Sequence, residues 1–355
     1  MYDRLNPSWE ATAVYRARVR GCLLGGAIGD ALGHPVEFAS LESIRARHGA
    51  AGVTALVPHR GGPVAQITDD TQMTLFTVEG LKRAHHYDRA RGPRAAWGWQ
   101  VREAYGRWFD TQRQSGPAPD ADPGLASQAW LYARRAPGNA CLSGLAQDFR
   151  PDPETRLGPP GPVNPQSKGC GTVMRSAPFG LTRDTPETAF GVSARCATTT
   201  HGHPTGYYAA GALAAIVAHL VEGESLEGAV LRTLRLLARH SGHEETTAAL
   251  HQALDLAAEG HPTAEKVESL GGGWVAEEAL AMGVYCALVE PDVRAALLLS
   301  VNHSGDSDST GSVCGNLLGA LLGDHGLPQD WLELVEGRAE ITVLADDFAT
   351  ECVRH

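Results

Sequence analysis

The sequence predicts an all-α protein. Alanine and leucine dominate its long segments, and β-branched runs that alternate with polar residues are scarce. Within these segments apolar residues recur three to four positions apart, which is the spacing of a helix with one buried face. Glycine and proline separate the segments. Length leaves the number of domains open, because 355 residues fit either two average domains or one large helical core.

The predicted helices follow the apolar spacing and the breaks between segments. They are expected at residues 14–31, 71–83, 95–111, 124–135, 187–199, 205–222, 226–240, 246–259, 274–289, 293–302, 311–322 and 329–337, followed by a polar tail. The proline-rich stretch 150–165 has the composition of an interdomain linker. We interpret it as a surface or active-site loop, because the motifs on both of its sides belong to one constellation. The sequence therefore predicts a single compact domain over residues 1–355, with its motif-bearing core at 14–323.

The chain is acidic, which restricts its partners. It has 41 acidic and 30 basic residues, and its formal net charge is −11 with neutral histidines. A surface of this sign repels nucleic-acid phosphates and anionic lipids unless a basic patch is present, and the sequence shows no such patch. We therefore expect no nucleic-acid partner. An acidic protein that handles an anionic substrate needs local cations, and bound metal ions would supply them.

Cysteine usage and the N-terminal composition predict the compartment. The seven cysteines are an odd number with no C-x-x-C spacing, which argues against a disulfide framework and a zinc ribbon. Residues 1–10 are polar and do not resemble a signal peptide. No apolar run approaches the length of about 18 residues that a membrane span needs. We therefore expect a cytoplasmic protein with no membrane association.

A pair of adjacent carboxylates, Asp69 and Asp70, precedes an apolar helical segment and is flanked by Thr68 and Thr71. Aspartate and threonine often occur at helix starts, where they accept hydrogen bonds from free amides and complement the helix dipole. Two neighbouring carboxylates exceed what a cap requires. They repel each other, and a divalent cation is the usual compensation. This cluster is therefore a candidate part of a metal site.

A second acidic cluster, with Asp306, Asp308 and Ser309, follows a polar loop and opens a helix rich in small residues. Small residues let a helix approach its neighbours closely, which suits a helix start buried at the centre of a fold. Two carboxylates two positions apart, with hydroxyls between and after them, form an all-oxygen ligand set. Hard cations such as Mg²⁺ or Mn²⁺ prefer such ligands, whereas zinc prefers histidine and cysteine.

Two other interpretations of the second cluster fail. The cluster matches the opening of an EF-hand loop, but the twelfth position, which requires a bidentate glutamate, is Leu317. It also matches the nucleophile loop of haloacid-dehalogenase-type phosphatases, which directly follows a buried strand. Here four polar residues separate it from the preceding apolar run, and too little chain follows it for that family's later motifs.

The glycine-rich segment 21–33 precedes another carboxylate, Glu37. A nucleotide-binding loop is excluded, because no strand precedes the glycines and no Lys-Ser/Thr pair follows them. The glycines instead predict a closely packed helix, after which the chain turns at Gly33 and presents Glu37. Asp30, near the end of this helix, is more typical of a structural hydrogen-bonding residue than of a catalytic one.

Two further stretches have the composition of ligand-binding loops. Backbone amides at Gly169 and Gly171 could bind phosphate oxygens, although a plain turn into a helix explains the glycines equally well. His201 and His203 lie in one turn and could bind a metal. Histidines in this position are more often structural residues that are hydrogen-bonded.

Taken together, these segments resemble the ADP-ribosylglycohydrolase family, which includes the dinitrogenase reductase-activating glycohydrolases. The matching segments are residues 21–38, 67–75, 168–178, 200–204 and 304–323. Each is weakly specific alone, but their order and spacing together are strongly specific, and the remainder resembles bacterial members. The resemblance implies an all-α fold with a binuclear Mg²⁺ or Mn²⁺ centre at the base of an ADP-ribose cleft.

The resemblance also implies the metal ligands. One metal would be bound by Thr68, Asp69 and Asp70, the other by Asp306 and the hydroxyl of Ser309, with Asp308 bridging the two. Many relatives have threonine in place of Ser309. A serine keeps the ligand oxygen but lacks the methyl group that restricts its rotamer.

Roles in catalysis and substrate binding follow from the same resemblance. The general base would be Glu37, Asp70 or Asp306, and the sequence does not choose among them. Gly169, Gly171 and Met174 would line the substrate cleft, and His201 would approach the phosphates or the adenosine.

The implied reaction is hydrolysis of an N- or O-glycoside at C1″ of an ADP-ribose. Its transition state resembles an oxocarbenium ion, which nearby anionic groups stabilise, and metals can orient a bound water. ADP-ribosylated protein and small-molecule ADP-ribose conjugates are the expected partners, and ADP-ribose the product. Arginine-linked ADP-ribose is favoured, because bacterial members with this motif set often act on it. Serine-linked ADP-ribose, O-acetyl-ADP-ribose and an ADP-ribosylated nucleobase remain alternatives.

An alternative of another class is a catalytically silent ADP-ribose-binding or structural relative. Such a protein should have lost metal carboxylates, whereas this chain retains every one that the motif requires. Recognition of an arginine guanidinium would need a carboxylate or an aromatic side chain near the cleft. Trp97, Trp99 and Trp130 are candidates that the sequence cannot place.

Overall fold

Residues 8–91, 96–121 and 123–353 are described by the computed structural model, and they fold into helices and connecting turns. Within them no sheet forms, and the only extended pairings are two isolated bridges, Ala65 with Val335 and Gly169 with Val275. The helices are α1 Trp9–Gly33, α2 Leu41–His48, α3 Asp69–Arg91, α4 Trp97–Thr111, α5 Asn139–Leu145, α6 Pro186–Ala197, α7 Pro204–Val221, α8 Leu226–Leu237, α9 Glu244–Glu259, α10 Ala264–Glu268, α11 Ala276–Val289, α12 Val293–Val301, α13 Ser307–Leu322, α14 Gln329–Leu334 and α15 Arg338–Val353. The predicted all-α class is confirmed.

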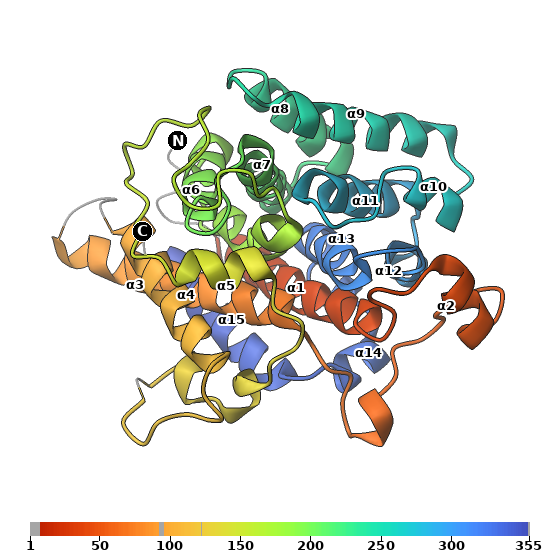
Figure 1. Cartoon of the computed structure of the whole chain (residues 1–355), viewed down its shortest axis with the longest axis horizontal. Coiled ribbons are helices and arrows are strands. Elements are labelled where there is room, and N and C mark those ends of the chain that lie inside the picture. The colour runs from red at the N-terminus through yellow and green to blue at the C-terminus, as the bar shows by residue number, and fades with distance from the viewer. Residues whose placement is uncertain (1–7, 92–95, 122, 354–355) are drawn as a thin grey trace.

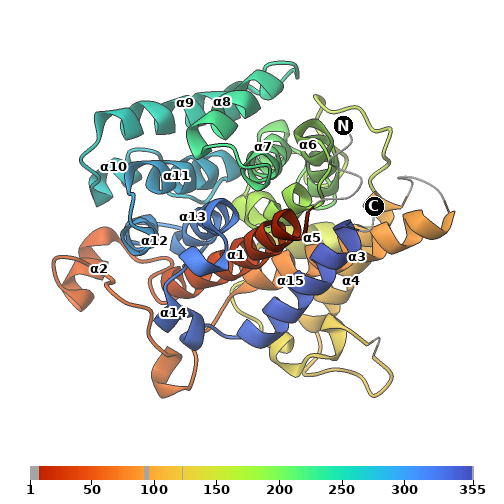
Figure 2. The same ribbon diagram turned by 180° about the vertical axis from the view of Figure 1, so that it is seen from behind.

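Helices α1 and α13 run side by side through the middle of the molecule (Figures 1 and 2). The layer of α8, α9 and α11 lies on one side of this pair, and α3 and α15 lie on the other. One hydrophobic core includes residues from Tyr15 to Cys352. The two ends of the described chain therefore share one core, and the predicted metal ligands at the starts of α3 and α13 are buried within the molecule.

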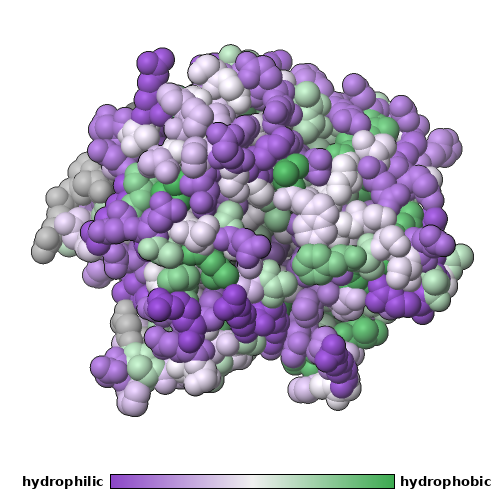
Figure 3. Space-filling view, in the orientation of Figure 1, coloured by the Kyte–Doolittle hydropathy of each residue, from purple (hydrophilic) through white to green (hydrophobic). Residues whose placement is uncertain are grey.

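Helix α7 is the most apolar of the long helices. By length and composition Pro204–Val221 could cross a membrane, but 83% of this window is buried inside the protein. The helix packs against α6, α8, α11 and α13. Its apolar composition is therefore explained by its position in the core. Figure 3 shows that hydrophilic residues cover most of the face seen in Figure 1, with hydrophobic residues in small separate patches.

Two predicted segments differ from the structure. Residues 124–135, predicted as one helix, form two short 3₁₀ turns, Leu125–Ser127 and Ala129–Tyr132. Gly124 has a positive φ of 143° and Gln128 is extended, so continuous α-helical hydrogen bonding is impossible there. The predicted polar tail is helix α15, which buries Ile341, Ala345 and Phe348 on one face. That spacing of apolar residues is helical and was present in the sequence.

Most other helix bounds lie within a few residues of the prediction, but α3 continues to Arg91, well beyond the predicted end at residue 83, and the short helices α2, α5 and α10 have no predicted counterpart. The predicted helix start at residue 95 and most of the polar segment 1–10 lie outside the described residues. The proline-rich stretch 150–165 packs against the start of α7. Gly158 N donates to the hydroxyl of Tyr207 at 2.8 Å, and the side-chain amide of Asn164 donates to the carbonyl of Thr200 at 2.8 Å. The stretch is therefore a packed surface loop.

Candidate metal centre

The end of α1 is held against the start of α13 by a seam of glycines. A Cβ atom added at Gly29 would overlap the carbonyl oxygen of Gly311. One added at Gly33 would overlap the carbonyl oxygen of Ser307. Because no side chain separates the two backbones, the helices approach as closely as their main chains allow. The seam places the last turn of α1 beside the first turn of α13, as the small residues in both segments predict.

Asp30, in the last turn of α1, holds the start of α3. Its carboxylate accepts hydrogen bonds from the backbone amide of Thr68 at 2.9 Å and from that of Thr71 at 3.1 Å. The hydroxyl of Thr71 also donates to it at 2.5 Å. These bonds satisfy amides at the start of α3 that have no partner within the helix. Asp30 therefore has the structural role that the sequence predicts, and it fixes α3 against α1.

The first acidic cluster lies in the first turn of α3. Asp69 accepts a hydrogen bond from the backbone amide of Gly138 at 3.3 Å, and the amide of Asp70 donates to the hydroxyl of Thr68 at 3.3 Å. All three side chains are buried. Oδ1 of Asp70 has no hydrogen-bond partner among the described residues. A buried carboxylate oxygen of this kind needs a ligand, because burial without a partner is unfavourable.

The second acidic cluster lies in the first turn of α13. Asp306 is the N-cap residue of this helix, and its own amide donates to the carbonyl of Gly272 at 2.9 Å. The amide of Ser309 donates to Asp308 at 3.0 Å. Asp306, Asp308 and Ser309 are each at most 3% exposed. Two helix starts, each with a partial positive charge from its dipole, therefore meet with their carboxylates buried.

Glu37 lies in the turn after α1 and joins the two clusters. Burial, together with the charges of Asp308, Asp306 and Asp69, raises its pKa to about 10. Burial and Asp308 likewise raise the pKa of Asp69, of Asp70 and of Asp306 well above the usual range. Asp308 is thus the carboxylate that all the others face. A carboxylate cluster of this density favours either bound protons or a bound cation.

The donor set fits a hard divalent cation. The predicted ligands Thr68, Asp69, Asp70, Asp306, Asp308 and Ser309 are brought together from two helices, and every side-chain donor among them is an oxygen. Mg²⁺ and Mn²⁺ prefer such ligands. The unpartnered Oδ1 of Asp70 is in addition an available donor. Which residue binds which ion stays a prediction.

The predicted substrate-binding glycines lie on a loop beside this centre. The carbonyl of Trp274 accepts a hydrogen bond from the amide of Cys170 at 3.1 Å, which ties the loop to the segment that also contacts Asp306. A 3₁₀ helix, Cys170–Arg175, follows and includes Gly171 and the buried Met174. The glycines therefore form a turn into a helical segment, which is one of the two interpretations of the sequence. The other, binding of phosphate oxygens by their backbone amides, stays a prediction.

His201 lies behind this loop. It is 2% exposed, and its Nδ1 is hydrogen-bonded to the hydroxyl of Thr200 at 2.7 Å. A Cβ atom added at Gly171 would lie 3.1 Å from the ring. Burial and the charge of Arg175 lower the pKa of His201 to about 3. His203 caps α7 by accepting a hydrogen bond from the amide of Thr205 at 3.2 Å. Both histidines therefore have the hydrogen bonds of structural residues, and contact of His201 with a substrate stays a prediction.

A pair of exposed aromatic rings was missed by sequence reasoning. Phe38 and Trp274 stack with ring centroids 5.1 Å apart and planes 23° from parallel. They are 67% and 42% exposed. Phe38 directly follows Glu37, and its amide donates to the carbonyl of Gly305, next to Asp306, at 3.2 Å. The pair therefore lies next to the acidic residues, because Phe38 follows Glu37 and the segment of Trp274 accepts a hydrogen bond from Asp306 at Gly272. Its only sequence signal was an aromatic residue after Glu37.

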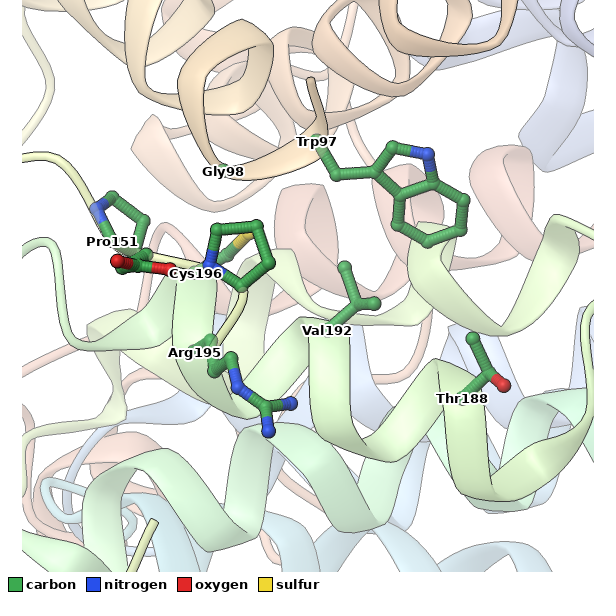
Figure 4. A pocket seen from close by; sticks show the side chains of 9 residues that line it. Trp97, Gly98, Pro151, Thr188, Val192, Arg195 and Cys196 are labelled. Carbon is green, nitrogen blue, oxygen red and sulfur yellow. The ribbon is translucent and has the colours of Figure 1, made fainter. Parts of the chain in front are cut away.

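The tryptophans considered for substrate recognition lie elsewhere. Trp97 lines a hollow of about 60 Å³ between α4, α6 and residues 151–153, opposite Arg195 and Val192 (Figure 4). Trp99 makes an edge contact with Tyr87. Trp130 packs against Gly337. The hollow of Figure 4 contains one carboxylate, that of Asp152, and no member of the acidic clusters.

Comparison with known proteins decides the family. The family model described as ADP-ribosylglycohydrolase matches residues 11–355. The chain belongs to the ADP-ribosylglycohydrolase family. As a member, it is a hydrolase of ADP-ribosylated substrates and releases ADP-ribose. The expectation drawn from the five sequence segments is confirmed at this level.

Three curated relatives in the ADP-ribosylglycohydrolase family align over most of their length. The ADP-ribosyl-[dinitrogen reductase] glycohydrolase of Rhodospirillum rubrum is 25% identical, with 91% of this chain and 92% of the relative covered. The human ADP-ribosylhydrolase ARH3 is 26% identical, with 94% and 93% covered. The ADP-ribosylarginine hydrolase Tri1 of Serratia proteamaculans is 24% identical, with 93% and 78% covered.

A solved structure shares the fold of this family member. It is described as an ADP-ribosylglycohydrolase-related protein complex and superposes with a TM-score of 0.60 at 23% sequence identity. The match covers 96% of this chain and 99% of the other. The helical arrangement around α1 and α13 is therefore that of a known ADP-ribosylglycohydrolase fold.

Proposed function

We propose that this ADP-ribosylglycohydrolase is a binuclear Mg²⁺- or Mn²⁺-dependent enzyme that removes ADP-ribose from arginine side chains. The observation that carries the metal dependence is the convergence of buried carboxylates from α3 and α13 around Asp308. Without cations these groups repel one another, because the charge that raises the pKa of Asp70 and of Asp306 most strongly is that of another carboxylate, Asp308.

The metal ligands are assigned from the two helix starts. Thr68, Asp69 and Asp70 would hold one ion, Asp306 and Ser309 the other, and Asp308 would bridge them. When bound, the ions supply positive charge for the ribose hydroxyls and lower the pKa of a bound water.

Proton transfer is assigned to Glu37. It is the least buried of the three candidate bases, since Asp70 and Asp306 are each 3% exposed whereas Glu37 is only partly buried. It also lies in a turn and not inside a helix, so its side chain can reach a substrate beside the clusters. A base must be within hydrogen-bonding reach of the proton that it moves.

The arginine preference is supported by the Phe38–Trp274 pair. A guanidinium group stacks well on an aromatic face, where charge and planar shape both contribute. The pair is exposed and adjoins Glu37 in the chain, so a modified arginine with its ribose near Glu37 would have its guanidinium near these rings. The printed names of two relatives, an ADP-ribosylarginine hydrolase and a glycohydrolase of ADP-ribosyl-[dinitrogen reductase], agree with this choice.

The test compares conjugates and metals. The protein is incubated with arginine-linked and serine-linked ADP-ribosyl peptides, with O-acetyl-ADP-ribose and with an ADP-ribosylated nucleobase, in Mg²⁺, Mn²⁺ or EDTA. We expect released ADP-ribose mainly from the arginine peptide and none in EDTA. Full activity in EDTA would overturn the metal dependence. Faster turnover of another conjugate would overturn the arginine assignment, and turnover of none would favour a silent ADP-ribose-binding relative.

Variants of the aromatic pair test how arginine is selected. Phe38→Ala and Trp274→Ala should raise KM for the arginine peptide by about 2- to 30-fold, the range of one cation–π contact. KM for O-acetyl-ADP-ribose should stay unchanged. Trp99→Ala is the matched control, because Trp99 is also an exposed tryptophan, at 39%, but contacts Tyr87. Equal changes for both substrates would refute selection by the rings.

A further inference from the structure

His34 lies beside two of the carboxylates. A ring nitrogen of His34 and one oxygen each of Glu37 and Asp308 all lie within 4.8 Å of one another. Donor atoms around one first-row metal ion, at bond lengths of about 2.1 Å, are separated by roughly 3 to 4.2 Å. The three donors are therefore within a small side-chain adjustment of a shared coordination sphere.

The position of His34 is fixed from both sides. It is the C-cap residue of α1, and its amide donates to the carbonyl of Asp30 at 2.9 Å. The preceding glycine lies in the seam against Ser307, so the backbone here packs directly on the start of α13. The ring stacks on that of His59, with centroids 5.5 Å apart and planes 26° from parallel. A side chain held in this way is preorganised for binding.

One nitrogen of His34 lacks a partner. Its Nδ1 is buried and makes no hydrogen bond within the part of the chain that the structure describes. Buried polar atoms without partners are uncommon and call for a water, an ion or a ligand. Stacking on His59 places the ring but does not satisfy this nitrogen. A purely structural histidine would be expected to have the kind of bond that His201 and His203 have.

We propose that His34 is a nitrogen ligand of the metal centre, acting together with Asp308 and with one oxygen of Glu37, whose other oxygen is left for proton transfer, and that it makes the centre prefer Mn²⁺ over Mg²⁺. The proposal rests on the metal-dependent function given above. Imidazole is a good ligand for first-row transition ions, whereas Mg²⁺ keeps to oxygen ligands and water. A centre of oxygens alone would discriminate less between the two ions. One imidazole supplies a reason for selection.

Pulsed EPR of the full-length protein tests the ligand directly. Mn²⁺ is titrated up to two equivalents, and ¹⁴N modulation from a coordinated imidazole is recorded. We expect this modulation in the wild type and in His59→Ala, the control that removes the neighbouring ring, and its loss in His34→Ala. Absence of ¹⁴N modulation throughout the wild-type titration would overturn the proposal, as would its persistence in His34→Ala.

Metal competition tests the selectivity. His34→Ala and the near-isosteric His34→Gln should bind Mn²⁺ at least about tenfold more weakly, while Mg²⁺ affinity changes by less than about threefold. An unchanged ratio of the two affinities would refute selection by His34. Hydrolysis by a wild type that lacks nitrogen coupling would refute this proposal and leave the proposed function standing. Nitrogen coupling without hydrolysis of any conjugate would support His34 and refute the function.

Discussion

The carboxylate of Asp30 accepts a hydrogen bond from the hydroxyl of Thr71 at 2.5 Å, and this bond joins the last turn of α1 to the first turn of α3. The same carboxylate also accepts hydrogen bonds from the backbone amides of Thr68 and Thr71. A residue that ligates no metal in our assignment thus positions residues that we assign as ligands. The metal centre depends on the junction of α1, α3 and α13 as much as on its own carboxylates.

We predict that Asp30→Ala destabilises the protein by about 1–3 kcal/mol at saturating Mg²⁺, because it leaves buried donors at the start of α3 unpaired. Mn²⁺ affinity should fall as well, since Thr68 and Asp70 lose their fixed positions. Urea unfolding and calorimetric titration measure the two effects. Asp30→Asn keeps one acceptor oxygen and should lose less of both. Equal stability of Asp30→Ala and the wild type would contradict this role.

We predict that Gly29→Ala is destabilising although alanine favours helices. The higher helix propensity of alanine would stabilise the folded protein by about 1 kcal/mol. The new Cβ, however, would overlap the carbonyl of Gly311 and force α1 away from α13, which costs about 1–3 kcal/mol or more. Gly106→Ala in α4 is the control, because its Cβ would meet only Arg102 Nη1 at 3.4 Å. Thermal unfolding should show a lower Tm for the first variant and an unchanged or higher Tm for the second. The reverse order would contradict the seam.

We predict opposite effects of Asp308→Asn with and without metal. In EDTA the variant should be more stable than the wild type near pH 8, because the charge of Asp308 raises the pKa of Asp69, Asp70 and Asp306 and is removed. With Mn²⁺ the wild type should be the more stable protein, and the variant should have lost hydrolysis. Scanning calorimetry under both conditions measures the inversion. Lower stability of the variant in EDTA would show that Asp308 supports the fold itself.

We predict that the metal-free protein loses stability as pH rises. The pKa of Asp30 is raised to about 7 and that of Glu37 to about 10, whereas such carboxyls titrate near about 4 in an unfolded chain. Between these values the folded state binds more protons than the unfolded state. The contribution of Asp30 and Glu37 to the free energy of unfolding is therefore present at low pH and is lost as pH rises. Tm in EDTA should therefore fall from about pH 5 to pH 8. Mg²⁺ or Mn²⁺ should raise Tm more at pH 8 than at pH 5. An equal rise in Tm at both pH values would contradict the prediction that a bound cation replaces protons on the carboxylates.

The sequence alone determined the helical class and the residues of the acidic clusters. Both depend on local signals, namely apolar spacing along helices and more carboxylate at a helix start than a cap requires. It also predicted the close packing of the glycine segment and the structural role of Asp30. Local signals mislead at Gly124, where a positive φ divides an apolar segment, and at α15, which has a buried face where the sequence predicts a polar tail.

Only the tertiary structure decided which distant residues meet. The acidic clusters are more than two hundred positions apart, and the closeness of Glu37 to Asp308 follows from the seam in which Gly33 touches Ser307. The stacking of Phe38 on Trp274 and the unpartnered nitrogen of His34 likewise depend on segments that are remote in sequence. The residue pattern of a segment shows which side chains each helix offers. Which helices make contact depends on how their surfaces pack, and this packing is a property of the whole chain.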